Sequence, residues 1–569
     1  MGNLFFSIKQ SGLSLLRNRM EIVRHKLPTL LFLSLFWFGC SSEESNSVEK
    51  KEEDISFFTP AKVELDELEE QLQLHFSEAQ TAYLLQKDSL QPMEEFKKFY
   101  QGRSFSSLWF NKTGLNKKAK DFILSFDSLI FDGLKLSDLG YDDIQTAQSL
   151  TTSDPITTEH ALEAELLLTR SLFKVTKAMI LGSVIDSNKE WKIKNDTLFN
   201  ESTWCRAIDT LSSFEYIQNL RPSHAWYKKF REEYIRLSID SSNQFDLNLT
   251  LLRDSIDSNL VSDKLHILRK QLFSICGLPN DTQSMVWSED LADALKHFQH
   301  LHQLKKTGHL DTSTVKALGT KSERKLKLLA LNMERMRWMA HEFKQPYIWV
   351  AIPKMELDYV EHDSVLFNMR VVVGRTSRPT PSLKSKVENI VLSPPWTVPP
   401  TIMKEEVVPG IARRGGSYLA RRGLKAYDSR GRVVNASAIN ASNYKRFSIG
   451  QAPGYRSSLG EVKFNMINPW AIYMHDTPHR EDFVKAYRAY SSGCIRVHHP
   501  KEFAAFLLRD SLNYSLQKID SICKLRRTKF IPMNRNIDVH VVYLTNAIDS
   551  VGNVMYLKDI YGWDKKTLN

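Results

Sequence analysis

The sequence predicts a multidomain α+β protein, in which a largely helical N-terminal part precedes a mainly β C-terminal domain. The chain has 569 residues, which is too long for one ordinary hydrophobic core. Apolar residues recur at helical spacing as far as about residue 270, and from Tyr347 onwards the apolar period shifts towards two. Two short amphipathic helices are expected between these regions. We therefore expect three or four folded units along the chain.

An export signal is expected over residues 1–40. An apolar run of about a dozen residues follows several basic side chains, and it is shorter than the roughly twenty residues that a membrane-spanning helix needs. At its end, Gly39-Cys40 is similar to a bacterial lipoprotein cleavage site, so we expect a lipid anchor on Cys40. Because Trp37 and Phe38 are larger than the residues usual there, simple cleavage or an uncleaved anchor stays an alternative.

Charge and cysteine content narrow the class of protein. Residues 41–60 are charged and lack an apolar period, which predicts a flexible tether. The formal net charge is +11, from 77 basic and 66 acidic residues. No nucleic-acid-binding signature accompanies it, so we expect an anionic envelope surface rather than nucleic acid as the partner. The five cysteines show no paired metal-binding spacing, and their disulfide pairing stays open.

Two helical units are expected before the β domain. Over residues 61–275, apolar residues follow helical spacing and prolines interrupt the pattern. Over residues 276–340, two amphipathic helices flank a glycine turn, and Asp311 or Thr312 can cap the second helix. This second unit resembles the small three-helix peptidoglycan-binding module. Such a module either binds murein or only packs against its neighbours, and fold alone does not decide between the two.

The last domain is expected over residues 341–569. Its predicted strands are β-branched runs bounded by Pro, Gly and Ser, at residues 347–353, 369–374, 389–392 and 539–544. Residues 410–450 interrupt the strand pattern with a basic, glycine-containing insertion. The insertion is expected either to be a mobile lid or to be an ordinary solvated loop.

One segment, residues 471–497, brings together residue types that suit nucleophilic catalysis. His475 follows a strand-like run, and Cys494 follows a Ser-Ser-Gly turn. A cysteine attacks as a thiolate, so it needs a base or a positive charge nearby. The amides of Gly493 and Cys494 could stabilise an oxyanion, because glycine permits a tight turn. Arg496 could bind a substrate carboxylate with its planar fork.

The residue pattern of this segment is similar to that of a known protein family. His-Asp-Thr-Pro at 475–478, followed by Ser-Ser-Gly-Cys-Ile-Arg-Val at 491–497, resembles the YkuD-type catalytic domain of L,D-transpeptidases, which are cysteine enzymes that cross-link peptidoglycan. The resemblance covers about residues 290–564. A looser resemblance over about 90–270 concerns the helical scaffold domain of large, multidomain members, although an ordinary aromatic-rich helical core explains the same residues. In those members an insertion at 410–450 caps the active site.

The resemblance implies a role for each residue of the segment. Cys494 would be the nucleophile and His475 its base, while Tyr473 would line the site and bind the oxyanion together with Gly493. The family often has a histidine where this chain has Ser492, so His475 is expected to serve alone. Ser491 and Ser492 are expected either to support the turn or to be purely structural.

The expected reaction is acyl transfer through a Cys494 thioester. The donor would be a tetrapeptide stem that releases its terminal D-amino acid, and the product would link two third-position diamino acids. Two alternatives stay open: an L,D-carboxypeptidase or D-amino-acid exchange enzyme acting on the same stems, and a non-catalytic murein-binding lipoprotein. We expect no cofactor. A zinc site formed by nearby histidines is disfavoured, because Pro478 interrupts any helix through them. The expected location is the periplasmic cell envelope.

Overall fold

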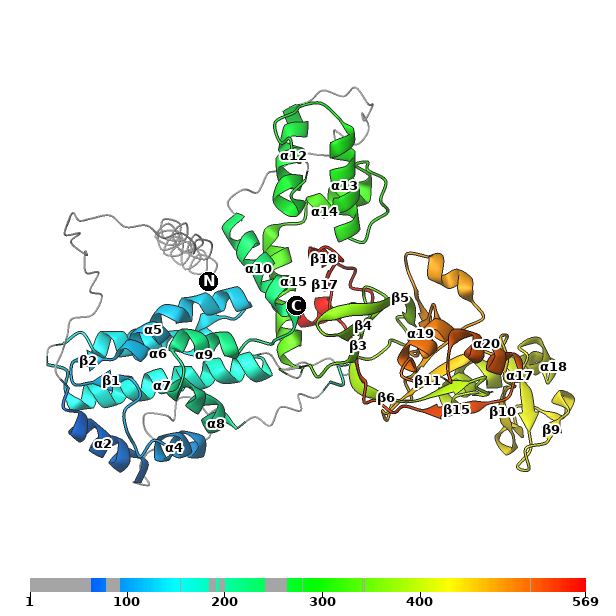
Figure 1. Ribbon diagram of the computed structural model, residues 1–569, viewed down its shortest axis with the longest axis horizontal. Coiled ribbons are helices and arrows are strands. Elements are labelled where there is room, and N and C mark those ends of the chain that lie inside the picture. Colours follow the sequence, from blue (N-terminus) through cyan, green and yellow to red (C-terminus); the bar gives the residue numbers. More distant parts are fainter. Residues whose placement is uncertain are drawn as a thin grey trace, which may run out of the picture. The chain divides into compact units, whose positions relative to one another are not determined.

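The computed structural model contains both the helical and the β parts that the sequence predicts, which confirms the predicted fold class (Figure 1). The expected signal peptide with Cys40 and the expected tether over residues 41–60 lie outside the described residues. Within the part of the chain that the structure describes, no helix has both the length and the apolar character needed to cross a membrane. The structure describes residues 63–77, 93–153, 155–183, 191–193, 200–240, 263–278, 280–339, 341, 343–511 and 513–568.

The N-terminal helical part is built around α7 (Thr158–Leu181), a helix of 24 residues. The helix begins after Thr157, whose side chain accepts a hydrogen bond from the backbone N–H of His160. Its apolar residues are buried on most sides, so α7 is the core of this part rather than a surface helix. The other elements here are α2 (Leu65–Ser77), α4 (Met93–Gln101), β1 (Phe110–Asn111), β2 (Gly114–Leu115), α5 (Lys117–Phe126), α6 (Tyr141–Leu150), α8 (Glu201–Arg206), α9 (Ser213–Asn219) and α10 (Ala225–Asp240).

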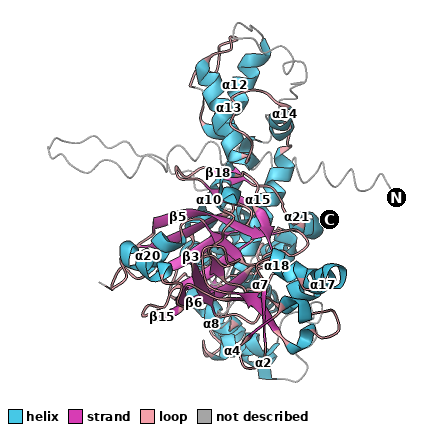
Figure 2. Ribbon diagram, turned by 90° about the vertical axis from the view of Figure 1, so that its right-hand side faces the viewer, coloured by secondary structure: helices cyan, strands magenta, loops and turns pink. Residues whose placement is uncertain are grey.

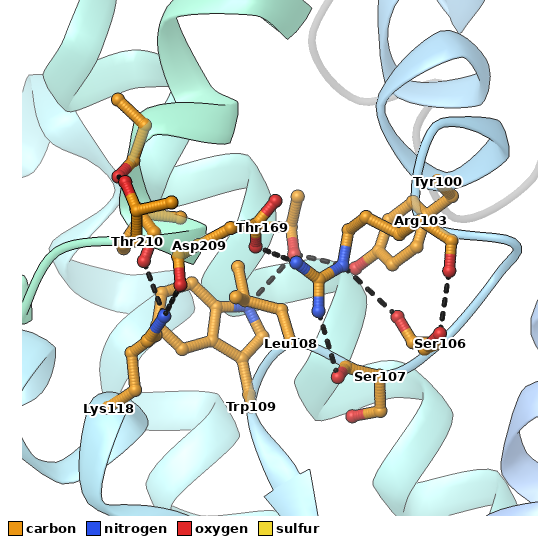
Figure 3. Close-up of polar contacts among 12 residues, drawn as sticks. Tyr100, Arg103, Ser106, Ser107, Leu108, Trp109, Lys118, Thr169, Asp209 and Thr210 are labelled. Atoms are coloured by element: carbon orange, nitrogen blue, oxygen red, sulfur yellow. Dashed lines mark hydrogen bonds and ion pairs between the residues drawn. The ribbon is translucent and has the colours of Figure 1, made fainter.

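A buried carboxylate on α7 fixes the chain that enters β1. Glu165 has no solvent exposure, and its two oxygens accept hydrogen bonds from the backbone N–H groups of Leu108 (2.7 Å) and Trp109 (3.1 Å). The hydroxyls of Tyr100 (3.0 Å) and Ser107 (2.7 Å) also donate to it. Figure 3 shows Tyr100, Ser107 and Trp109 together with Thr169, a second residue of α7, whose hydroxyl accepts a hydrogen bond from the Trp109 indole at 2.9 Å. Four donors satisfy a group that would otherwise be costly to bury.

The helix α15 (Ser322–Arg337) leads into the C-terminal domain and carries buried arginines. Arg337 donates to the hydroxyl of Tyr227, on α10, at 2.9 Å. Arg335 forms an ion pair with Asp564 near the C-terminus at 2.6 Å, and both side chains are almost completely buried. Because unpaired buried charges are destabilising, these contacts bind α15 both to the helical part and to the C-terminal domain.

A separate three-helix module consists of α12 (Asp263–Cys276), α13 (Glu289–Leu301) and α14 (Thr312–Leu318), which share one apolar core. Figure 2 shows these helices as a group without strands. Of the two predicted caps of α14, Asp311 is the one that accepts a hydrogen bond, from the backbone N–H of Thr314 at 2.8 Å. The buried Gln299 amide accepts from the backbone N–H groups of Thr307 and Gly308, which fixes the glycine turn.

The C-terminal domain is organised by a large mixed sheet with the strand order β11-β12-β14-β5-β4-β3-β16-β6-β15. β11 also pairs with β6, so the first strand of this order bonds to a strand near the other end. The core of the domain lies between this sheet and helix α19. The elements are β3 (Tyr347–Ala351), β4 (Glu356–Glu361), β5 (Ser364–Gly374), β6 (Leu383–Leu392), β11 (Val462–Met466), β12 (Met474–His475), β13 (Ala489–Ser491), β14 (Ile495–Val497), α19 (Pro500–Leu507), α20 (Leu516–Lys524), β15 (Lys529–Pro532), β16 (Asp538–Val542), β17 (Asn546–Ile548), β18 (Val554–Tyr556) and α21 (Trp563–Leu568).

The insertion between β6 and β11 is folded. Residues 396–451, here called the insertion subdomain, contain a small sheet of strand order β7-β10-β8-β9 and their own apolar core, which includes Ile411, Leu419 and Ile449. This region is therefore more than a solvated loop. Its elements are β7 (Trp396–Thr397), α16 (Pro400–Ile402), a π-helical turn (Met403–Val407), α17 (Val408–Arg414), α18 (Ser417–Arg421), β8 (Lys425–Tyr427), β9 (Val433–Val434) and β10 (Ser448–Gln451).

The buried carboxylate of Glu165 gives a test of the helical part. We expect Glu165→Gln to lower the free energy of unfolding by about 1–3 kcal/mol, because an amide turns one acceptor into a donor that faces donors. Urea unfolding followed by circular dichroism would measure the loss. Glu163→Gln, on the same helix but partly exposed, is the control. Equal loss in the two variants would contradict the role of Glu165.

Candidate active site

The candidate site is organised by the parallel pairing of β12 with β14. Their register places His475 opposite Arg496, and the backbone N–H of Ile495 donates to the carbonyl of Tyr473 at 3.0 Å. Side chains alternate between the two faces of a strand. Met474 and Ile495 therefore enter the core, whereas Tyr473, His475, Cys494 and Arg496 lie on the opposite face.

His475 is buried and held in one orientation. Its Nδ1 lies 2.5 Å from the backbone carbonyl of Asp476, and because a carbonyl only accepts, Nδ1 carries the proton. The lone pair of Nε2 is then available to take up a proton. Burial lowers the pKa of His475 to about 3, and the positive charges of Arg496 and Lys463 act in the same direction. The imidazole is thus neutral at physiological pH, as a general base must be.

Cys494 is half-buried, and its thiol donates to the carbonyl of Ala471 at 3.6 Å. Burial raises the pKa of the thiol. Hydrogen bonds from the backbone and side chain of Tyr473 oppose this rise, as do the charges of Lys463 and Arg496. The site therefore holds a neutral thiol that is hydrogen-bonded to Ala471, with a neutral imidazole on the same face of the paired strands. The cations Lys463 and Arg496 are placed to stabilise the thiolate once the proton leaves.

Tyr473 connects the thiol to the insertion subdomain. Burial and the neighbouring thiol raise the pKa of its phenol, so the hydroxyl keeps its proton and can donate. The side chain of Trp396, on β7, opposes this rise in the pKa of the phenol. Trp396 was not predicted as a site residue, because its Pro-rich surroundings carry no strand period.

Lys463 is a second residue that the sequence analysis missed. It pairs with His475 across β11 and β12, and its Nζ lies 4.1 Å from the centre of the Tyr473 ring. No carboxylate within the described ranges forms an ion pair with it, whereas Arg496 pairs with Asp482 at 3.3 Å. The sequence did contain a signal for this residue. Lys463 lies between the apolar residues Val462 and Phe464 of a strand, so its side chain is on the face of the strand opposite to theirs.

The Ser-Ser-Gly turn before Cys494 is held by its own hydrogen bonds. The Ser491 hydroxyl donates to the Cys494 carbonyl at 2.5 Å and accepts from the Gly493 backbone N–H at 3.1 Å. Gly493 has a φ of 114°, which favours glycine. The Gly493 amide, which was expected to bind an oxyanion, is thus occupied by Ser491 in this structure. Ser492 is exposed, and its hydroxyl accepts from Arg378 at 3.0 Å.

Arg378 also joins this turn to the insertion subdomain. Its guanidinium binds Glu405 and lies 3.2 Å from Glu406, both on the π-helical turn. Arg375 adds a contact to Glu406 at 3.4 Å. Among the described residues, no three or more His, Cys, Asp and Glu side chains come together in a way that could hold a metal ion.

The placement of Lys463 predicts how Cys494 reacts. Alkylation of Cys494 should keep accelerating above the ordinary cysteine pKa of about 8.5, since burial raises the thiol pKa. Lys463→Met should lower the alkylation rate at pH 8 by about three- to tenfold, because the thiolate loses a nearby cation. Lys463→Arg should restore most of the rate. Measuring the rate against pH with iodoacetamide, and detecting the Cys494 peptide by mass spectrometry, tests this.

The matched control is Lys529→Met. Lys529 also lies over a tyrosine ring, that of Tyr514 at 5.1 Å, but on another part of the domain. An unchanged pH profile in Lys463→Met, or an equal change in Lys529→Met, would contradict the electrostatic role of Lys463.

Three parts of the chain match known protein families. Residues 345–519 match the family model of the L,D-transpeptidase catalytic domain (YkuD), residues 94–233 match a scaffold domain, and residues 264–318 match a family described as "Putative peptidoglycan binding domain". A Haemophilus influenzae protein named "Putative L,D-transpeptidase" is 34% identical over 241 residues, which are 42% of this chain and 48% of that protein. The match thus spans about half the length of that relative.

These matches confirm the resemblance that the sequence suggested. The matched families are those of a catalytic domain and of a peptidoglycan-binding domain. Residues 345–519 therefore belong to the family of L,D-transpeptidase catalytic domains, in a chain that also carries a scaffold domain and a peptidoglycan-binding domain.

Proposed function

We propose that the protein is a cysteine L,D-transpeptidase that links third-position diamino acids of neighbouring peptidoglycan stems. The observation that carries this proposal is the common face shared by Tyr473, His475 and Cys494 on paired strands. A neutral buried base, a nucleophile and a protonated hydroxyl donor are the groups that acyl transfer requires. The match to the catalytic-domain family supports the choice of substrate.

The acylation step begins when Nε2 of His475 takes the thiol proton of Cys494. The thiolate attacks the carbonyl carbon that follows the L-centre of the third residue in a tetrapeptide stem. The negative charge that develops on the carbonyl oxygen is stabilised by the Tyr473 hydroxyl. When the amide bond breaks, His475 gives its proton to the nitrogen of the departing D-amino acid. A thioester on Cys494 remains.

In the second step, the neutral side-chain amine of a neighbouring diamino acid attacks the thioester carbonyl. His475 accepts the proton that the amine loses, and the carbon–sulfur bond breaks. The new amide links the two stems, and Cys494 regains its proton from His475. Arg496 lies on the same face and would bind a carboxylate of the stem, although Asp482 shares its charge.

The remaining parts have supporting roles in this proposal. The insertion subdomain acts as a lid over the bound stem, since Trp396 and Arg378 connect it to the catalytic turn. The three-helix module binds murein, in line with its family match. The proposed location is the periplasm, with a lipid anchor on Cys40 that holds the chain to a membrane.

Purified disaccharide tetrapeptides would test the reaction. We expect the intact protein to form a dimer mass that Cys494→Ala does not form, because the thioester needs the sulfur. Cys276→Ala, which removes a thiol far along the chain, should retain the product. Mass spectrometry with fragmentation would locate the new bond between third-position residues.

The other products separate the alternatives. Tripeptide without dimer would identify an L,D-carboxypeptidase, and incorporation of added D-amino acid would identify exchange. If dimer formed equally with Cys494→Ala, or if no stem were altered by the intact protein, the proposed cysteine chemistry would be wrong, and a non-catalytic murein-binding role would be favoured.

A further inference from the structure

The insertion subdomain carries most of the net charge of the protein. Between residues 401 and 450 there are ten basic and three acidic residues, which gives a net charge of +7. The whole chain has a net charge of +11. Less than a tenth of the sequence therefore holds well over half of the excess positive charge, and such a concentration of one sign attracts polyanions.

The three acidic residues of this region are already occupied. Glu405 and Glu406 bind arginines of the catalytic domain, and Asp428 binds Arg432 at 2.9 Å. No other basic side chain of the region has an ion pair with a carboxylate in the part of the chain that the structure describes. All of these basic residues are exposed: Lys404, Arg413, Arg414, Arg421, Arg422, Lys425, Arg430, Lys445 and Arg446.

This charge is presented on a folded support rather than on a loose loop. Leu419 lies in the core of the subdomain, two residues before Arg421 on α18, and Ala426 is buried next to Lys425 on β8. The apolar positions hold the backbone, and the cations point to solvent. These exposed basic residues are here called the cationic array. A preformed array loses less conformational entropy when it binds a ligand than a flexible segment does.

The array reaches the catalytic site through a short series of contacts. The carbonyl of Arg422 accepts a hydrogen bond from the side chain of Gln451 at 3.0 Å. Gln451 pairs with Trp396 in the sheet, and the Trp396 side chain is near enough to the Tyr473 phenol to lower its pKa. The backbone at Arg422 is therefore joined to β10 and β7, which lead towards Tyr473.

We propose that the insertion subdomain is a cationic docking surface for the carboxylates of peptidoglycan stem peptides that approach Cys494. The proposal rests on the function proposed above and extends it to how the substrate is recruited. Arginine, the commonest cation of the array, binds carboxylates through two parallel hydrogen bonds. Continuity with the catalytic strand favours a substrate of this site over an anionic phospholipid surface, the other anionic partner of comparable charge.

Binding without turnover would test the docking surface. The Cys494→Ala protein would be titrated against a fluorescent disaccharide tetrapeptide, with anisotropy as the readout. We expect Arg421→Glu with Arg422→Glu to weaken binding about tenfold at low salt, because two attractive charges become repulsive, and the difference should shrink as added salt screens the charges. A tetrapeptide with amidated carboxylates should bind weakly to the unaltered surface and should show little difference between the proteins.

Lys565→Glu with Lys566→Glu is the matched control. These lysines are exposed on α21, and the double change alters the net charge by the same amount. Circular dichroism would verify that both variants are folded. Retained binding in the control, with loss in the arginine variant, is the expected result.

Two results would overturn the proposal. The first is equal binding of the tetrapeptide by the arginine and lysine variants. The second is an arginine variant that loses binding to anionic phospholipid vesicles but binds the tetrapeptide as before. Both differ from failure of the proposed function, because binding is measured in a protein that lacks the nucleophile. A protein that cross-links stems but binds them independently of Arg421 and Arg422 would refute only the docking surface.

Discussion

The chemistry of the site depends on the parallel pairing of two very short strands, β12 and β14. Their register aligns His475 with Arg496 and brings Tyr473 beside Cys494. Backbone hydrogen bonds therefore fix the positions of the proposed base, hydroxyl donor and nucleophile along their strands. Met474 and Ile495 hold the same strands in the core from the other face. A displacement of either strand by one residue would exchange the buried and catalytic faces, because side chains alternate.

The electrostatic environment of the site differs for the three groups His475, Arg496 and Lys463. Burial keeps His475 neutral, so the imidazole accepts a proton and does not serve as the permanent partner of a thiolate. The charge of Arg496 is shared with Asp482. Lys463 has the least compensated charge near the thiol, and burial lowers its own pKa while the thiol raises it. A long-lived thiolate is thus avoided, and the negative charge that arises during proton transfer is stabilised.

The parts outside the sheet attach to the site through polar contacts of different kinds. The insertion subdomain binds through Trp396 and the Arg378 contacts at a half-exposed surface, where ion pairs exchange with solvent more readily than in a core. α15 binds through the completely buried Arg337 and Arg335. The first kind of contact suits an element that admits a substrate, and the second suits a permanent joint between domains.

The sequence by itself determined the fold class, because apolar periods of 3.6 and 2 follow from helix and strand geometry, and it singled out His475 and Cys494, whose chemistry is local. It also predicted that Asp311 or Thr312 caps a helix. It did not identify Lys463 or Trp396, which come from β11 and β7 and reach the site only through strand pairing between segments distant in the sequence. Tertiary structure also decided that the Gly493 amide binds Ser491, since hydrogen-bond partners depend on the folded turn.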